Sequence, residues 1–450
     1  MQTTICALAT GTGGAVALVR LSGPKSLSLF HTLTKRADEP APRQQIFCTL
    51  YDGNDVLDKA LVTYFKAPHS YTGEDVVEFA LHASPYIKGR LLELLCANGA
   101  TLAKRGEFSQ RAFLNGKMDL VEAQGLCDLI ASGNKAAHKL AMDSLDGKLS
   151  ARLDDLKKRL SELLAQIEVR LDDVDEEMTP LSDEFISGEL NAVLAHIKAL
   201  AYTFSVGKFI KEGLKTALVG APNSGKSSLL NALVGFDRAI VSAASGTTRD
   251  TVEETLEING QKIILTDTAG IREHALDPAE QEGMKRSVRA MEKADLIVLV
   301  LDATRALTPE EETLWTDIQN QHKRTLVVLN KMDAAPAAVC PLKNAQKYTV
   351  LPVSCKTGEG LAALKKALTA DVTEAQTADG LMISNLRHFE ALLNAQTELE
   401  SALIRLNTHA GGEIYAEHLR RALGALQDLI GEVTPDDVLG IIFSKFCMGK

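Results

Sequence analysis

Residues 1–117 combine short apolar runs with a helical stretch. The runs at 15–21 and 60–65 predict β-strands, and the apolar spacing over 86–97 predicts a helix between Gly, Pro and Ser signals. We therefore expect an α+β domain over residues 1–117. From 118 to 212 apolar residues recur every three or four positions, with charged residues between them and little glycine, which predicts long amphipathic helices. The basic run at 157–159 is interpreted as a solvated helix face rather than an RNA patch.

Residues 213–372 alternate short apolar runs with helical segments. The runs at 214–219, 263–266, 296–301, 325–329 and 349–353 predict the strands of a mostly parallel sheet with crossover helices. Asn259-Gly260, between 252–258 and 261–266, predicts a hairpin and one antiparallel edge strand. Helical spacing returns over 373–450. The pattern indicates a multidomain chain in which an α/β domain is inserted into an α-helical domain that follows the α+β domain.

Composition narrows the class of protein. The 450 residues carry 49 Lys and Arg against 59 Asp and Glu, a net charge of −10, so the chain as a whole lacks a basic surface for nucleic acid. Its seven cysteines form no CxxC pair, which argues against a zinc site or a disulfide framework and favours a reducing compartment. The first basic residue is Arg20 and the longest apolar run is 296–301, so we expect a cytoplasmic protein without a signal peptide or membrane span.

A phosphate-binding loop is predicted at 220–227, where GAPNSGKS fits GxxxxGK(S/T) between a predicted strand and a predicted helix at 228–233. Glycines let backbone N–H groups surround phosphates, Lys226 adds a positive charge, and the Ser227 hydroxyl is placed to bind Mg²⁺. The expected phosphate-binding residues are Asn223, Ser224, Gly225, Lys226, Ser227 and Ser228.

Two segments after this loop are expected to respond to the γ-phosphate. The sequence DTAG follows the strand at 263–266, where an acid suits the surroundings of Mg²⁺ and a glycine N–H can reach the phosphate. The sequence GTTRD at 246–250 is the expected switch loop, in which Thr248 is assigned as a second Mg²⁺ ligand and, with Lys226, as a catalytic residue. The residues assigned to nucleotide binding here are Thr247, Thr248, Asp267, Thr268, Ala269 and Gly270.

Guanine specificity is predicted by NKMD at 330–333, which follows the strand at 325–329. The Asp333 carboxylate can accept two hydrogen bonds from the guanine edge, whereas adenine would leave it unpaired. The expected base pocket consists of Asn330, Lys331, Asp333, Ser354, Cys355 and Lys356. Ile271 follows DTAG where Ras-like enzymes carry a water-positioning Gln, so a charge or base must come from elsewhere.

The motifs GAPNSGKSSLLNAL, VSAASGTTRD, DTAGIRE and NKMD resemble small bacterial GTPases of the translation-factor-like branch. SYTGEDVVE at 70–78, RGEFSQRAFLNGKMDL at 105–120 and FCMGK at 446–450 extend the resemblance over essentially the full length to the MnmE (TrmE) family of tRNA modification GTPases. This resemblance implies an N-terminal domain, similar to folate-dependent aminomethyltransferases, that binds 5-formyl- or methylene-tetrahydrofolate and forms a homodimer. The matching folate positions are Arg20, Glu78, Lys117 and Lys450.

The resemblance also implies that K⁺ replaces an arginine finger in GTP hydrolysis. The positions that match its potassium ligands are Asn223, Ser242, Ala244 and Thr247. The matching water-orienting acid is Glu280, with Glu282 as an alternative. Cys447 is either an ordinary tail thiol or a thiol close to the folate and the modification site.

A flavin-dependent partner, MnmG (GidA), is implied by the same family. It would carry FAD in a heterotetrameric or larger complex that adds a carboxymethylaminomethyl group at C5 of the wobble uridine of certain tRNAs. The main alternative is a ribosome-assembly GTPase that acts as an RNA-binding timer. Such proteins often carry a KH domain, but no GxxG loop follows residue 375.

Overall fold

The computed structural model describes residues 3–11, 13–171, 179, 181–236, 254–266, 288–370, 380–409, 411–432, 436–444, 446 and 449. These residues belong to two compact units. One comprises Met1–Cys127, Ser144–Lys158 and Leu423–Lys450, and the other comprises Asp128–Asp143 and Arg159–Ala422. The domain boundaries expected after residues 117, 212 and 372 stay predictions.

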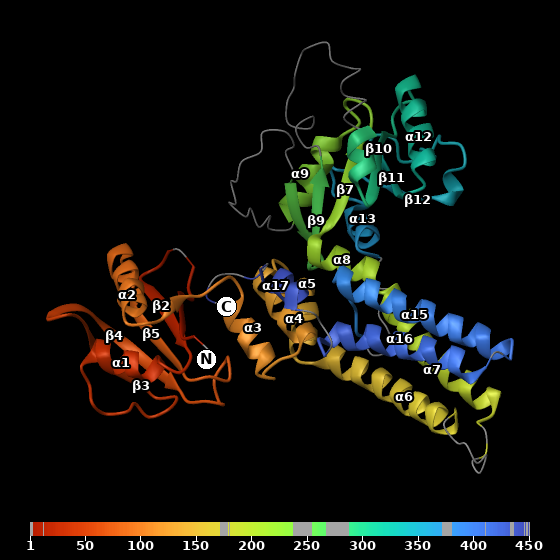
Figure 1. Cartoon of the computed structure of the whole chain (residues 1–450). Coiled ribbons are helices and arrows are strands. Elements are labelled where there is room, and N and C mark those ends of the chain that lie inside the picture. The colour runs from red at the N-terminus through yellow and green to blue at the C-terminus, as the bar shows by residue number, and fades with distance from the viewer. Residues whose placement is uncertain are drawn as a thin grey trace. The chain divides into compact units, whose positions relative to one another are not determined.

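The first unit contains a six-stranded sheet in the order β3-β4-β5-β2-β1-β6, antiparallel except for the β1–β6 pair (Figure 1). Its strands are β1 (Ile5–Leu8), β2 (Val16–Ser22), β3 (Gln45–Asp52), β4 (Asp55–Phe65), β5 (Val76–His82) and β6 (Thr101–Leu102). Helices α1 (Ser26–Thr34) and α2 (Pro85–Ala97) pack on one face, where Phe30 and Leu95 join Val19 and Phe79 in the core. Because side chains alternate along a strand, Arg20 and Glu78 lie on the other face.

The C-terminal helix belongs to this unit. Helix α17 (Asp436–Ser444) packs against α3 (Glu107–Leu114), and Phe443 and Phe446 share an apolar cluster with Leu120. A side chain at Gly449 would collide with the Leu8 carbonyl, so the end of the chain lies directly against β1. Residues from the two ends of the sequence therefore build one folded unit.

The second unit contains a six-stranded sheet in the order β12-β11-β10-β7-β9-β8, parallel except for the β8–β9 pair. Its strands are β7 (Leu214–Val219), β8 (Glu254–Ile258), β9 (Gln261–Thr266), β10 (Leu296–Asp302), β11 (Arg324–Asn330) and β12 (Thr349–Pro352). Helices α9 (Lys226–Phe236) and α12 (Pro309–Gln321) lie between strands of this sheet in the sequence, and α13 (Leu361–Leu368) follows β12. A 3₁₀ turn, η1, spans Ala345–Lys347. The mostly parallel sheet and the hairpin at Asn259-Gly260 are confirmed.

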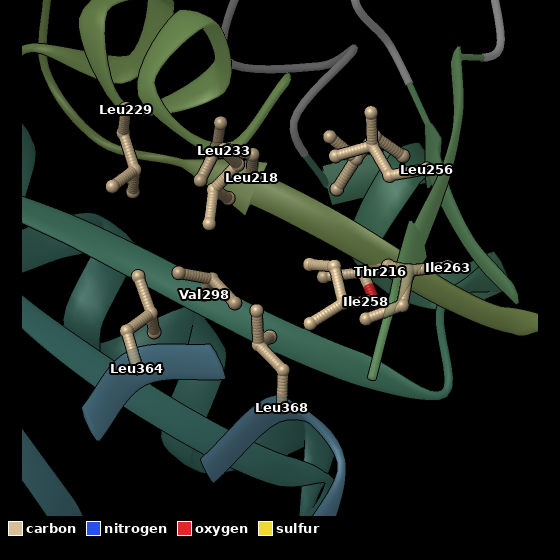
Figure 2. Close-up of a pocket in the computed structure, with 11 residues that line it drawn as sticks. Thr216, Leu218, Leu229, Leu233, Leu256, Ile258, Ile263, Val298, Leu364 and Leu368 are labelled. Carbon is tan, nitrogen blue, oxygen red and sulfur yellow. The ribbon is translucent and has the colours of Figure 1, made fainter. Parts of the chain in front are cut away.

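The core of this sheet is closely packed. In Figure 2, Leu229 and Leu233 of α9 and Leu364 and Leu368 of α13 surround a cavity in the sheet core. The cavity has a volume of about 10 Å³, and Thr216 is the polar residue in its otherwise apolar lining. A site this small and apolar is too poor in hydrogen-bond partners to hold a water molecule.

Long helices make up the rest of the second unit. Helix α7 (Asp183–Tyr202) packs along α15 (Leu386–Asn407), and α8 (Phe204–Glu212) leads through Gly213 into β7. By length and composition the segment Asp183–Glu212 could cross a membrane, but half of its apolar window is buried inside the structure. Charged and polar residues interrupt the segment, so it contains no long apolar run in the sequence. The remaining helices contribute residues to both units: α4 (Leu120–Ala131), α5 (Lys135–Leu145), α6 (Lys148–Leu171) and α16 (Gly412–Ile430).

The β8–β9 hairpin touches two helices of its own unit. The Asn259 side-chain amide donates to the Thr369 hydroxyl at the end of α13, at 3.1 Å. The Ala136 N–H, in the first turn of α5, donates to the Gly260 carbonyl at 3.4 Å. The tip of the hairpin is therefore bonded to the helix that follows β12 and to a helix of the predicted helical domain.

Candidate functional site

The loop between β7 and α9 is shaped for close approach of other backbone and side chains. Gly225 has φ +100°, a conformation that favours glycine, and a Cβ there would collide with the Asn330 side-chain amide. Asn223 is also left-handed, at φ +62°. The second glycine of the GxxxxGK(S/T) motif is therefore required for steric reasons, because the side chain of Asn330, in the predicted base pocket, occupies the space that a Cβ would need.

Lys226 begins α9 and lies over this loop. Its ammonium group donates to the carbonyls of Gly220 and Ala221, at 2.8 and 2.9 Å. Burial lowers the pKa of Lys226, and the negative charge of Glu311 opposes that shift. A phosphate would be a stronger partner for this cation than two neutral carbonyl oxygens.

The first helical turn offers further groups for a nucleotide. The Ser224 hydroxyl is fully buried and has no hydrogen-bond partner among the described residues. Ser227 and Ser228 are exposed on the first turn of α9. An unsatisfied buried hydroxyl, a lysine and a helix N-terminus fit a phosphate, and the Ser227 hydroxyl is the described group that would hold Mg²⁺.

Asn330 connects the phosphate loop to the base pocket. Its side-chain amide donates to the Ser224 carbonyl at 3.1 Å, and its side-chain oxygen accepts from the Cys355 N–H at 3.3 Å. The residue is buried at the end of β11. One side chain therefore holds together three segments that are far apart in the sequence.

Asp333 has its carboxylate fixed from one side. The Ser354 hydroxyl donates to Asp333 Oδ1 at 2.7 Å, and Ser354 is itself fully buried. Burial raises the pKa of the Cys355 thiol to about 11, so this cysteine is neutral and contributes through its backbone. Lys356 is exposed at the same loop. The structure thus brings together the base-pocket residues expected from sequence.

Lys331 has a partner that the sequence analysis did not identify. Its ammonium group lies 2.7 Å from Asp302 Oδ2, at the end of β10. Asp302 and Asn330 are direct neighbours in the parallel pairing of β10 and β11. A signal for Asp302 was present in the sequence, because it is an acid at the end of a buried strand. Asn330, which was recognised, occupies the equivalent position at the end of β11.

The remaining expected GTPase residues lie outside the described part of the chain. They are the switch-loop positions, the DTAG motif and the expected water-orienting acid: Ser242, Ala244, Thr247, Thr248, Asp267, Thr268, Ala269, Gly270 and Glu280. Among the described residues no three His, Cys, Asp or Glu side chains cluster as metal ligands. A magnesium ion held largely by phosphates needs no such cluster.

A second cluster lies on the face of the N-terminal sheet opposite α1 and α2. Arg20 donates to Glu78 at 2.7 Å and to the Gly449 carbonyl at 3.3 Å. Its guanidinium lies over the rings of Tyr71 and Phe108, 5.1 and 5.7 Å from their centroids. Two of the expected folate positions, Arg20 and Glu78, are thus direct partners, and they lie beside Gly449. The sequence did not identify the two aromatic rings next to them.

Lys117 is exposed and lies beside Gly73, whose Cβ would be 3.4 Å from its Cγ. Gly73, Glu74 and Asn115 line a cavity of about 780 Å³ at this end of the sheet. Cys447 and Lys450 lie outside the described residues.

The sequence matches two families. Residues 4–117 match the family described as GTP-binding protein TrmE N-terminus, and residues 120–447 match the MnmE helical domain. The tRNA modification GTPase MnmE of Aquifex aeolicus is 40% identical over 456 residues, covering 100% of both chains. That of Parabacteroides distasonis is 37% identical over 467 residues, again covering 100% of both chains.

Solved structures of GTPases are also similar. Aquifex aeolicus Era bound to GDP and aluminium fluoride is 31% identical, with a TM-score of 0.28, over 41% of this chain and 65% of the other. Era bound to MgGDPNP and a segment of 16S ribosomal RNA is 23% identical, with a TM-score of 0.27, over 51% of this chain and 98% of the other.

Proposed function

This chain belongs to the MnmE family of tRNA modification GTPases, and on that premise we propose that it hydrolyses GTP to drive modification of the wobble uridine in certain tRNAs. The product would be a carboxymethylaminomethyl group at C5, with a tetrahydrofolate derivative as one-carbon donor. A flavin-dependent partner, MnmG, would carry the FAD. The protein would act in the cytoplasm as a homodimer within a larger complex.

The contacts among the residues of the predicted guanine pocket are the observation that carries the proposal. Asp333 is oriented by Ser354, and Asn330 joins the base loop to the phosphate loop. A carboxylate held in place before the nucleotide arrives discriminates guanine from adenine, because adenine would leave it without donors. These contacts support GTP as the substrate, with Mg²⁺ held by Ser227 and, as proposed, Thr248.

The Arg20–Glu78 pair supports a folate site on the N-terminal sheet. A carboxylate suits the donor edge of a pterin, and the adjacent cation and aromatic rings suit a flat, partly anionic ligand. The pair is mostly enclosed, with side-chain exposures of 16% and 19%. Lys117 and Lys450 are proposed to bind the carboxylates of the same ligand, and Cys447 to lie near it.

The β8–β9 hairpin supports the link between hydrolysis and modification. It lies in the sequence between the proposed switch loop and DTAG, and its tip bonds to α5 and α13. A change in either flanking segment would therefore act on a strand pair that is attached to the helical part. We propose this as the route by which nucleotide state reaches the helices.

Potassium activation gives the first test. Asn223, Ser242, Ala244 and Thr247 are the proposed K⁺ ligands, and Glu280 the proposed water-orienting acid. GTP hydrolysis is expected to be much faster in KCl than in NaCl at equal ionic strength. Asn223→Ala should abolish the difference, whereas Asn320→Ala, an exposed asparagine on α12, should preserve it. Equal wild-type rates in the two salts would refute the potassium proposal.

The decisive test of the function is the nucleoside content of tRNA. Wobble uridines from cells that lack the protein should lose the carboxymethylaminomethyl group by mass spectrometry. Plasmid-borne wild type should restore it, and Asp333→Asn should not. Asp317→Asn, an aspartate on α12 without an ion pair among the described residues, is the matched control. Unchanged nucleosides in the deletion strain would contradict the modification role and leave the GTPase intact.

A further inference from the structure

Asp302 ends strand β10 beside the start of the guanine-binding loop. In the parallel pairing it lies opposite Asn330, and the Ala303 N–H donates to the Asn330 carbonyl at 2.9 Å. Its Oδ2 accepts from the Lys331 ammonium group at 2.7 Å. Its Oδ1 accepts from the Thr304 N–H and hydroxyl, at 2.9 and 2.6 Å. Both carboxylate oxygens are therefore engaged, and the side chain has a fixed direction.

The pair is unequal in its exposure to solvent. The Asp302 side chain is 8% exposed and that of Lys331 is 39% exposed. Burial favours the protonated acid, but hydrogen bonds from Lys331 and Thr304 outweigh it and hold the pKa of Asp302 at about 2. The carboxylate is thus ionised throughout the physiological range, and it anchors the more exposed lysine.

The backbone of the base loop needs such an anchor. Lys331 has φ +66°, a left-handed conformation that is unfavourable for a residue with a side chain. Its two functional neighbours each have their own attachment, Asn330 to the Ser224 carbonyl and Asp333 to the Ser354 hydroxyl. The Lys331–Asp302 contact is a further attachment of the same short loop, and it joins the lysine side chain to the end of β10.

We infer that Asp302 is a positioning residue of the guanine pocket, which acts through Lys331. It holds the Lys331 side chain and the left-handed backbone in place, so that Asn330 and Asp333 meet the base without prior rearrangement. Loss of the carboxylate leaves the phosphate loop intact and loosens the base loop. Guanine nucleotides should then dissociate faster, while affinity for a ligand that has only phosphates should stay the same.

The test is stopped-flow release of mant-GDP from the full-length protein. Asp302→Ala is expected to accelerate release about two- to fivefold, the range for one ion pair that is partly open to solvent. Asp302→Asn keeps an acceptor for Lys331 and should recover part of the loss. Asp317→Ala, on α12 of the same unit, is the matched control and should release at the wild-type rate.

Two further measurements separate positioning from general destabilisation. In the Lys331→Ala background, Asp302→Ala should add little, since its effect passes through the lysine. Pyrophosphate affinity, measured by displacement of mant-GDP and corrected for the changed mant-GDP affinity, should be unchanged by Asp302→Ala.

An unaltered release rate, full additivity in the double variant, or an equal loss of pyrophosphate affinity would each overturn the inference. The inference rests on guanine-nucleotide binding, so failure of the wild type to bind mant-GDP would instead refute the proposed GTPase function.

Discussion

His388 should make the stability of the second unit depend on pH. The residue lies in the first turn of α15, where its side chain is buried. Burial, followed by the positive charges of Arg387 and Lys211, lowers its pKa from 6.5 to about 3. In the unfolded chain the ring takes up a proton below pH 6.5, whereas the folded protein keeps it neutral. The contribution of neutral His388 to stability is therefore complete above pH 6.5 and is lost as the pH falls toward 3.

The size of this effect follows from proton linkage. With one proton taken up only by the unfolded state, the free energy of unfolding falls by about 1.4 kcal/mol for each pH unit well below 6.5. Between pH 7.5 and 5.0 the loss amounts to about 2 kcal/mol. A loss of that size is a large fraction of the stability of a typical domain.

The single tryptophan makes the assay specific to this unit. Trp315 is buried in α12, so its fluorescence during urea unfolding reports on the second unit. His388→Gln should remove about 2 kcal/mol of the pH dependence measured for the wild type between pH 7.5 and 5.0. His138→Gln, an exposed histidine on α5, should retain it. The NMR signal of the His388 ring, assigned by its loss in the variant, should not titrate above pH 5. Parallel pH profiles for wild type and His388→Gln would refute the reasoning, as would a titration midpoint above pH 5.

Three other substitutions test the packing of the second unit. Gly225→Ala should abolish mant-GDP binding because its Cβ would collide with Asn330, whereas Gly188→Ala, with open space around it, should bind normally. Leu364→Ala removes a fully buried side chain from the sheet core and should lower the free energy of unfolding by about 2–5 kcal/mol in the Trp315 assay; a change below 1 kcal/mol would contradict close packing. Thr369→Val removes the acceptor of the hydrogen bond from the hairpin tip to α13 and leaves the left-handed Asn259 unchanged, so it should cost about 1 kcal/mol in the same assay. No change would mean that the contact is not stabilising.

The sheet of the second unit was predictable because each of its strands is marked by a clear local pattern of apolar residues or turn residues. Strand β10 is buried on both faces, so it reads as an unbroken apolar run, and β7 begins and ends where its run does. The β8–β9 hairpin was predictable from its two-residue turn, whose Asn259 adopts the left-handed conformation that such turns require. In these elements local sequence and tertiary environment agree.

The N-terminal sheet was less predictable because its pairings are distant and its edges are irregular. Strand β6 has two residues and pairs with β1, which is far from it in the sequence. Strand β3 is an edge strand with Phe47 exposed and a register shift at Leu50, so its alternation does not identify a core face. Without a partner strand such segments have no local signal that separates them from loops.

The site shows the same limit at the level of single residues. Motif spacing identified Asn330 and Asp333, because each follows the end of a recognisable strand. It could not identify Asp302 as the partner of Lys331, since that contact depends on the register between β10 and β11. The pairing of Arg20 with Glu78 likewise depends on the register of β2 and β5. Resemblance identified both residues, but only the fold makes them partners.

The two sides of the GTPase sheet differ in how firmly their loops are attached, and this difference indicates which side can move when GTP is hydrolysed. On the base side, Asn330 and Asp302 fix the binding loop to the phosphate loop and to β10. A pocket braced in this way reports the presence of guanine but has little freedom to move with the γ-phosphate. On the opposite edge, β8 has one neighbouring strand, and the hairpin tip is attached to α5 by the Ala136–Gly260 hydrogen bond. An edge hairpin with few attachments can shift at lower cost than a braced loop, so the physical asymmetry favours the hairpin as the mobile element.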